Sequence, residues 1–197
     1  MNDRRSEYRL PRGSVVAATA LFALLAAAGC AEQRDRSTVL KSIPTAEIRF
    51  SGKKSGMGEM AITVPKSYVF DLASSDQRDN FFFTDPADSS ERQKGMIFLS
   101  LGLQPVEFIA DSIEVEQTGG KIAGEDVTWR EAVDTVDGGT RLYRKEAIAR
   151  DLMKLYPSPG TKGGYILQAM VVGTDPVLVE RLMASVESIH PVKKGNL

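Results

Sequence analysis

The sequence predicts an α+β fold in which a single antiparallel β-sheet is packed by helices. Short runs rich in β-forming residues recur along the chain and are separated by turn residues, whereas two segments have apolar residues at helical spacing. The order is strands, a middle helix, hairpin strands and a terminal helix. There is no regular β–α–β alternation and no internal repeat, so a parallel sheet is not expected.

The first strands are expected in "AEIRF" and "MAITVP", where apolar and polar residues alternate. The glycine-rich segment "SGKKSGMGE" between them is expected to be a loop. Further along, "NFFFT" and "GMIFLSL" are typical of buried strands, and "GYILQAMVV" is a third strand of that kind.

Two helices are predicted, near 105–117 and 176–189. The first rests on apolar residues at helical spacing, with Gly119-Gly120 as a stop, although Ile113 and Val115 leave a strand possible at its end. The second has Asp175 as N-cap and Pro176 at its first position, and Pro191 prevents continuation. Its apolar stripe, which should lie on the sheet, consists of Val179, Leu182, Met183 and Val186.

A β-hairpin is predicted where "DVTWREAVD" and "TRLYRKEAIA" flank Gly138-Gly139, because two glycines supply the positive φ angles of a tight turn. Arg141, Tyr143 and Lys145 alternate on one face of the second strand. We expect Arg130 across the hairpin on a matching face, and Trp129 in the core. Because Arg and Tyr suit interface hot spots, these four residues form a candidate partner-binding face; an ordinary polar sheet face is the alternative.

The N-terminal segment has the three zones of a secretory signal. Arginines are concentrated in Met1–Arg12, Val15–Ala28 is apolar or small, and small residues end at Gly29, directly before Cys30. The 14-residue apolar run reaches only about 21 Å as a helix, too short to span a bilayer. A cysteine in this place resembles the lipobox of bacterial lipoproteins, except that Ala27 stands where the family prefers leucine.

The lipobox resemblance implies cleavage between Gly29 and Cys30 and a diacylglycerol thioether on Cys30. The protein is then anchored to a membrane of the bacterial cell envelope by its lipid. An ordinary secretory signal followed by an accidental cysteine is the alternative. The expected divisions are a signal peptide (1–29), a lipidated N-terminus and flexible tether (30–45), an α+β domain (46–191) and a tail (192–197). The alternative for the tether is an added edge strand, because Val39, Leu40 and Ile43 can pack.

The order of elements over 46–191 resembles the PsbP-like fold family. The resemblance rests on "ITVPKSYVF", "GGKIAGEDVTWREA" and "GTDPVLVERLMASVESIHP". It implies a binding or assembly factor rather than an enzyme, and it carries no functional residues over to this chain.

Charge and residue types restrict the function further. Taking four Arg and two acids in 1–29 from totals of 25 basic and 26 acidic residues leaves 21 and 24, a net charge of −3. This excludes a nucleic-acid binder that depends on phosphate contacts. With only one cysteine the chain has no internal disulfide.

Residues suited to catalysis or metal binding are sparse. His190 is the only histidine, and no G-x-S-x-G elbow accompanies it. "GMGEMA" precedes a strand rather than a helix, and "DPADSSE" lacks the alternate ligands of an EF-hand loop. We therefore expect no cofactor and no metal. The leading hypothesis is a non-enzymatic protein-binding module, an immunity lipoprotein or an assembly factor; the alternative is a periplasmic hydrolase with an unconventional active site. The sequence does not indicate an oligomeric state.

Overall fold

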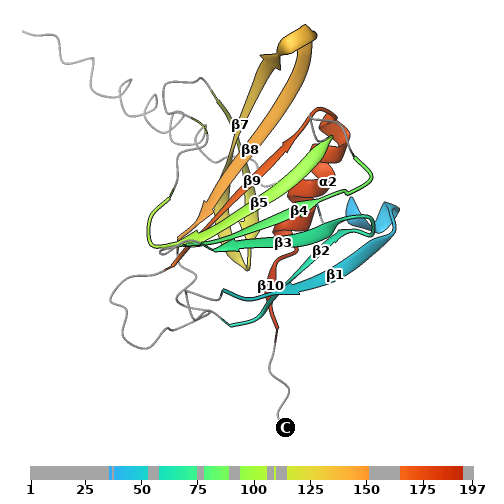
Figure 1. The fold of residues 1–197 in the computed structure, drawn as a ribbon. Coiled ribbons are helices and arrows are strands. Elements are labelled where there is room, and N and C mark those ends of the chain that lie inside the picture. The colour runs from blue at the N-terminus through green and yellow to red at the C-terminus, as the bar shows by residue number, and fades with distance from the viewer. Residues whose placement is uncertain are drawn as a thin grey trace, which may run out of the picture. The chain divides into compact units, whose positions relative to one another are not determined.

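The computed structural model describes residues 36, 38–52, 58–74, 78–88, 94–105, 109, 115–150 and 165–192. The expected signal peptide, Gly29, Cys30 and the start of the expected tether lie outside these residues. Two antiparallel sheets and the helix α2 (Pro176–Glu187) make up the described architecture (Figure 1). None of the described helices is long and apolar enough to cross a membrane.

The larger sheet has seven strands, each antiparallel to its neighbours. Their spatial order is β3 (Val69–Ser74), β4 (Asp79–Thr84), β5 (Gly95–Gly102), β9 (Ile166–Gly173), β8 (Thr140–Ala149), β7 (Glu125–Val136) and β6 (Glu116–Ile122). The smaller sheet consists of β1 (Thr45–Phe50), β2 (Met60–Pro65) and β10 (His190–Pro191). The 3-10 turns are η1 (Leu40–Ser42) and η2 (Asp137–Gly139).

The predicted fold class, an α+β fold with a single sheet packed by helices, is wrong. The described residues form ten strands in two sheets, and α2 is the one α-helix among them. Part of the covering expected from a second helix comes from the smaller sheet, whose Phe50, Met60 and Ile62 enter the same apolar core as α2. Phe50 lies 5.0 Å from Phe81 of β4, measured between ring centroids. The domain is therefore mostly β.

The predicted helix near 105–117 falls mostly on residues outside the described ranges. Where it is described, Glu116 and Gln117 begin strand β6, and Gly119-Gly120 lie within that strand instead of ending a helix. A side chain on Gly120 would place its Cβ 2.2 Å from Glu187 Oε1 and 2.6 Å from Trp129 Nε1. Gly120 therefore lies where β6 closely approaches the Glu187 and Trp129 side chains. From the sequence alone, a glycine in this role cannot be told from one that ends a helix.

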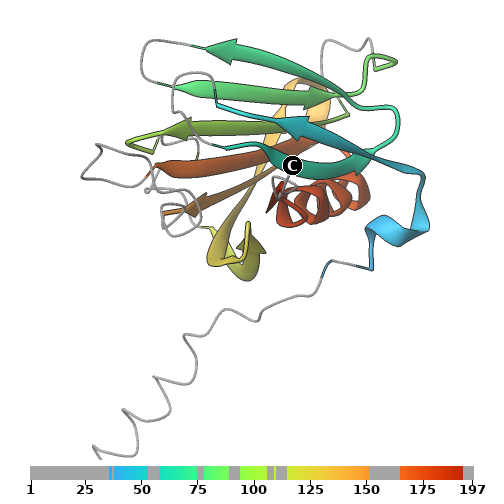
Figure 2. The same ribbon diagram turned by 90° about the horizontal axis from the view of Figure 1, so that it is seen from below.

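The terminal helix is confirmed as α2. The Asp175 side chain caps it, accepting a hydrogen bond from the Val177 amide at 2.9 Å, and Pro176 occupies the first turn. All four residues of the predicted apolar stripe are buried. Because this stripe packs against β9, β5 and β2, the helix lies across both sheets (Figure 2).

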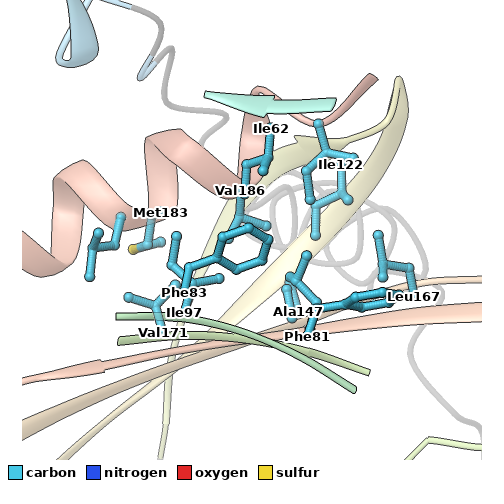
Figure 3. Packing of buried hydrophobic residues seen from close by; sticks show 14 of the residues in the cluster. Ile62, Phe81, Phe83, Ile97, Ile122, Ala147, Leu167, Val171, Met183 and Val186 are labelled. Carbon is cyan, nitrogen blue, oxygen red and sulfur yellow. The ribbon is translucent and has the colours of Figure 1, made fainter. Parts of the chain in front are cut away.

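The core lies between the helix, the smaller sheet and one face of the larger sheet. Figure 3 shows Met183 and Val186 of α2 facing Phe83, Ile97 and Val171 of the sheet. Trp129 is fully buried, as the sequence predicted. Burying a side chain of this size contributes about 2–3 kcal/mol relative to leaving it exposed, so the core is the main source of stability in a chain with one cysteine.

The part of the expected tether that the structure describes is not a free linker. Leu40 is buried, and the Arg36 side chain is only 3% exposed. Its guanidinium lies 3.1 Å from Glu180 Oε2 and 2.8 Å from Glu187 Oε1, both on α2. It also donates to the Gly119 carbonyl and the Thr118 hydroxyl, at 3.4 and 3.3 Å. The packed domain thus includes Arg36, ten residues before the predicted boundary at 46.

Glu187 lies at the centre of this contact. Its Oε1 accepts hydrogen bonds from Arg36 and, at 2.9 Å, from the Trp129 indole. Burial raises the pKa of the Glu187 carboxyl above its ordinary value, and the lowering effects of Arg36 and Trp129 do not offset it. We call Arg36, Glu187 and Trp129 the N-terminal clamp.

Removing the cation of the clamp should destabilise the domain. Arg36→Met leaves two carboxylates facing each other beside a buried indole, and breaking a buried pair on one side costs about 3 kcal/mol or more. The matched control is Arg49→Met, because Arg49 and Glu47 form an exposed pair, 58% and 48% accessible, worth less than about 1 kcal/mol. Urea unfolding of the three proteins measures both changes. Equal midpoints for Arg36→Met and wild type would contradict a structural role of the clamp.

The raised pKa of Glu187 predicts a pH dependence with a definite sign. A carboxyl whose pKa is higher in the folded state stabilises the fold below the unfolded pKa of about 4.3, and this contribution is lost as the pH rises through the folded value. Glu187→Gln removes the titrating group. The free energy of unfolding of wild type minus that of Glu187→Gln should therefore be largest near pH 4 and fall towards pH 7. If this difference in unfolding free energy rises with pH instead, Arg36 lowers the pKa of Glu187 more than burial raises it.

Candidate functional site

The predicted hairpin is confirmed as strands β7 and β8. Gly138 and Gly139 both have φ of +76°, the positive values that the turn was expected to need. Pairing of β8 with β9 ends at Tyr143 and Gly173, whereas pairing with β7 continues to Val136 and Thr140. The last turn of the hairpin therefore projects beyond the rest of the sheet (Figure 1).

The four residues of the predicted partner-binding face do not share one face. Arg130 is opposite Glu146, and Lys145 is opposite Glu131. Arg141, Tyr143 and Lys145 therefore lie on one face, and Arg130 lies on the other. A two-residue turn at Gly138-Gly139 would have placed Arg130 on the matching face. The turn includes Asp137 as well, and one extra residue reverses the face of every residue across the hairpin.

Lys145 is buried and is not available to a partner. Its Nζ donates to Glu131 Oε2, and the Lys145 and Glu131 side chains are 10% and 9% exposed. Glu131 Oε1 also accepts a hydrogen bond at 2.8 Å from Thr118, which in turn accepts one from Arg36. A chain of buried polar groups therefore joins Lys145 at the base of the hairpin to the N-terminal clamp.

Arg130 takes part in a second polar cluster on the opposite face. Its guanidinium lies 3.9 Å from Glu146 Oε2, and the Glu146 side chain is only 2% exposed. Glu146 also accepts hydrogen bonds from the Gln168 side chain and, at 3.3 Å, from the Ile109 amide. Arg130 is thus an ion-pair partner of the buried Glu146 carboxylate. The sequence pattern did not indicate this structural role.

The part of the predicted face that remains accessible lies near the hairpin tip. Arg141 and Thr135 are exposed, Tyr143 is half-buried against the core, and Val133 is 52% exposed. All four lie on one face because Val133 is opposite Tyr143 and Thr135 is opposite Arg141. We call Val133, Thr135, Arg141 and Tyr143 the hairpin surface. Val133 and Thr135 were not predicted to belong to this face. With a three-residue turn, the alternation of side chains along β7 places both of them on it.

A cleft of about 660 Å³ lies elsewhere on the domain. It is formed where the segment before β1, the β2–β3 turn, the loop after β4, the start of β5 and the first turns of α2 meet. The lining residues are Ile43, Pro44, Pro65, Lys66, Ser67, Tyr68, Asp85, Ala87, Asp88, Lys94, Gly95, Leu178 and Arg181. It shares no residue with the hairpin surface.

The wall of this cleft is held by Tyr68 and Asp85. The buried Tyr68 hydroxyl donates to the Gly95 carbonyl at 3.0 Å, and burial, with Asp85 and Asp88 nearby, raises its pKa. Asp85 accepts hydrogen bonds from the Ser67 hydroxyl at 2.8 Å and the Ala87 amide at 3.0 Å. These contacts fix the two turns that border the cleft.

The residues singled out for catalysis or metal binding are not brought together. His190 is exposed in β10, and its Nδ1 lies 2.9 Å from the Ser188 carbonyl oxygen. Asp85 and Asp88 belong to the cleft, whereas Glu91 lies outside the described residues. Within the described ranges, no three His, Cys, Asp or Glu side chains are grouped to hold a metal ion.

No family model matches this chain, and no curated protein matches it. The resemblances to bacterial lipoproteins and to the PsbP-like family therefore stay predictions.

The two basic residues on one face of β8 should respond differently to substitution. Lys145→Met leaves Glu131 buried without its cation, so we expect a loss of about 3 kcal/mol in unfolding free energy. Arg141→Met should change stability by less than about 0.5 kcal/mol, because Arg141 is an exposed residue near the hairpin tip. Thermal and urea unfolding of the two variants give the comparison. Equal effects would contradict the separation between a buried base and an accessible tip.

Proposed function

We propose that this protein is a non-enzymatic, lipid-anchored binding protein of the bacterial cell envelope that contacts a protein partner through the hairpin surface. The anchor is supported by the sequence alone: Cys30 follows a basic, then apolar, then small-residue segment. An immunity lipoprotein and an assembly factor both fit this description. Catalysis by an unconventional hydrolase site is the competing proposal.

The observation that carries the proposal is the projecting end of the hairpin. Val133 is one of four large apolar side chains that are prominently exposed among the described residues, and it lies across from Tyr143. Arg141 adds a charge next to these apolar groups. Aromatic and arginine side chains around an apolar centre are the usual composition of an interface hot spot.

Ion pairs on both faces of the hairpin support its use as a preformed recognition element. Arg144 Nη2 and Asp134 Oδ2 lie 2.5 Å apart across the two strands. Lys145 and Glu131 form a buried pair at the base. Since these contacts already hold the two strands together, little conformational freedom is lost when the tip binds.

The charge of Arg141 favours an acidic protein surface as the partner, because complementary charge speeds encounter and fixes orientation. Val133, Thr135 and Arg141 are exposed, and a partner can contact them without disturbing the core. A hydrolase would instead need a nucleophile or a general acid–base pair within a cleft.

Site-specific photocrosslinking in envelope preparations tests this proposal. A benzoylphenylalanine at Val133 should give one discrete adduct, which mass spectrometry identifies as an acidic protein. The same group at Val69, which is also exposed at 47% but lies on β3, is the matched control and should not give that adduct. Adding Arg141→Glu should reduce the Val133 adduct at least fivefold by charge reversal.

The anchor is tested in the same preparations. Cys30→Ala should move the protein out of the detergent-extracted membrane fraction or leave an unprocessed precursor, because the thiol that receives the lipid is absent. Identical fractionation of Cys30→Ala and wild type would contradict the anchor. An identical adduct from Val133 and Val69, or none from Val133, would contradict the hairpin surface.

A further inference from the structure

We infer that the cleft beside Tyr68 is a second binding site, which takes a small amphipathic anion: an apolar chain or ring that bears one carboxylate. This site is independent of the proposed function, because it shares no residue with the hairpin surface and needs neither a lipid anchor nor a protein partner. It rests on the size of the cleft, on its apolar walls and on the charges at its border.

The size of the cleft suits a small molecule. Its volume of about 660 Å³ is within the range of about 300–1,000 Å³ that ligand sites occupy. Its borders come from parts of the chain that are far apart in sequence, from Ile43 to Arg181. The turns that carry them are held by the Ser67–Asp85 and Tyr68–Gly95 hydrogen bonds. The cleft is therefore already formed without a ligand.

The walls of the cleft are largely apolar. The apolar lining comes from Ile43 and Pro44, from Pro65 and Tyr68, and from Leu178 of α2. The Tyr68 hydroxyl is already bonded to the Gly95 carbonyl, so this residue offers its ring to the cleft and not a free polar group. An apolar ligand body gains about 25 cal/mol for each Å² that such walls remove from water.

Three cations border these apolar walls: Lys66 from the β2–β3 turn, Lys94 next to β5 and Arg181 from α2. Among the described residues, no carboxylate forms an ion pair with any of them. Several cations elsewhere in the described domain are paired with carboxylates, as at Arg36, Lys145 and Arg144. The three cations of the cleft thus differ from the structural cations.

The two acids of the cleft do not neutralise these cations by direct contact. Asp85 accepts from the Ser67 hydroxyl and the Ala87 amide, and Asp88 accepts from the Lys94 backbone amide. These hydrogen bonds of Asp85 and Asp88 order the turns, and no described carboxylate forms an ion pair with the side-chain ammonium or guanidinium groups of the cleft. A ligand carboxylate can then bind Arg181 in the bidentate manner that the guanidinium favours.

Titration calorimetry with 4-phenylbutyrate tests the inference on the full chain in phosphatidylcholine nanodiscs. This probe joins an apolar ring and chain to one carboxylate. Three comparison compounds separate its parts: 4-phenylbutylamine reverses the charge, 4-phenylbutanol removes it, and propionate removes the apolar body. Empty nanodiscs measure partition into lipid. We expect saturable binding of 4-phenylbutyrate that is at least tenfold tighter than that of each comparison compound.

Variants locate the binding site. Arg181→Glu and Lys94→Glu should each weaken 4-phenylbutyrate at least tenfold, because a charged hydrogen bond is replaced by repulsion. Lys121→Glu is the matched control: Lys121 is exposed on β6, outside the cleft, and should leave binding unchanged. Circular dichroism melting confirms that each variant is folded. Since the two cleft variants change different elements, at least one is expected to remain folded.

Several outcomes would overturn the inference. They are the absence of saturable binding above that of empty nanodiscs, equal affinity for the amine and the carboxylate, and unchanged affinity in folded Arg181→Glu or Lys94→Glu protein. None of these results bears on the crosslink from Val133, so the two proposals fail separately.

Discussion

The buried contact between Arg36, Glu187 and Trp129 holds together three parts of the chain that are far apart in sequence. Arg36 belongs to the N-terminal segment, Glu187 ends α2, and Trp129 lies in β7. A disulfide often has this task in a secreted domain, but a chain with one cysteine cannot form one internally. Gly120 makes the contact possible, because any side chain there would overlap Glu187 and Trp129. Packing of the helix on the sheet therefore depends on a glycine in β6 as much as on the apolar stripe of α2.

The same polar groups determine which part of the hairpin is rigid and which is accessible. From Arg36 the hydrogen bonds continue through Thr118 and Glu131 to Lys145, at the base of the hairpin. Buried polar groups that are fully paired fix one arrangement of the elements that they join. Beyond Tyr143 the strands pair only with each other. A partner bound at the tip, as proposed, would be supported by a base whose polar groups are already paired, the arrangement that favours precise binding.

Local patterns predicted several of the elements correctly, but not β3 or β6, and they predicted tertiary relations poorly. Alternating apolar residues located β1, β2 and β7, and Asp175 with Pro176 located the start of α2, because period and capping act within a few residues. The face of Arg130 was wrong since it depends on a single residue, Asp137, in the turn. Lys145 and Arg36 resemble any surface cation in the sequence, and only pairing with residues far along the chain shows that they are buried. Gly119-Gly120 has the composition of a helix stop, but Gly120 lies in a strand where Glu187 and Trp129 leave no room for a side chain. The cleft had no sequence signal at all, because its borders come from five separate segments.

The N-terminal clamp also limits how far from the bilayer the proposed lipid anchor would let the domain stand. A free tether over 30–45 would let the domain stand up to about 45 Å from the bilayer. Arg36 is fixed on the domain, so only the six-residue step from Cys30 to Arg36 remains, which spans at most about 20 Å when extended. A lipid on Cys30 would then hold the domain near the membrane surface instead of allowing it to search a wide volume. A partner that meets the hairpin surface would have to be at the same level of the envelope, and restricting two molecules to one layer raises their effective concentration.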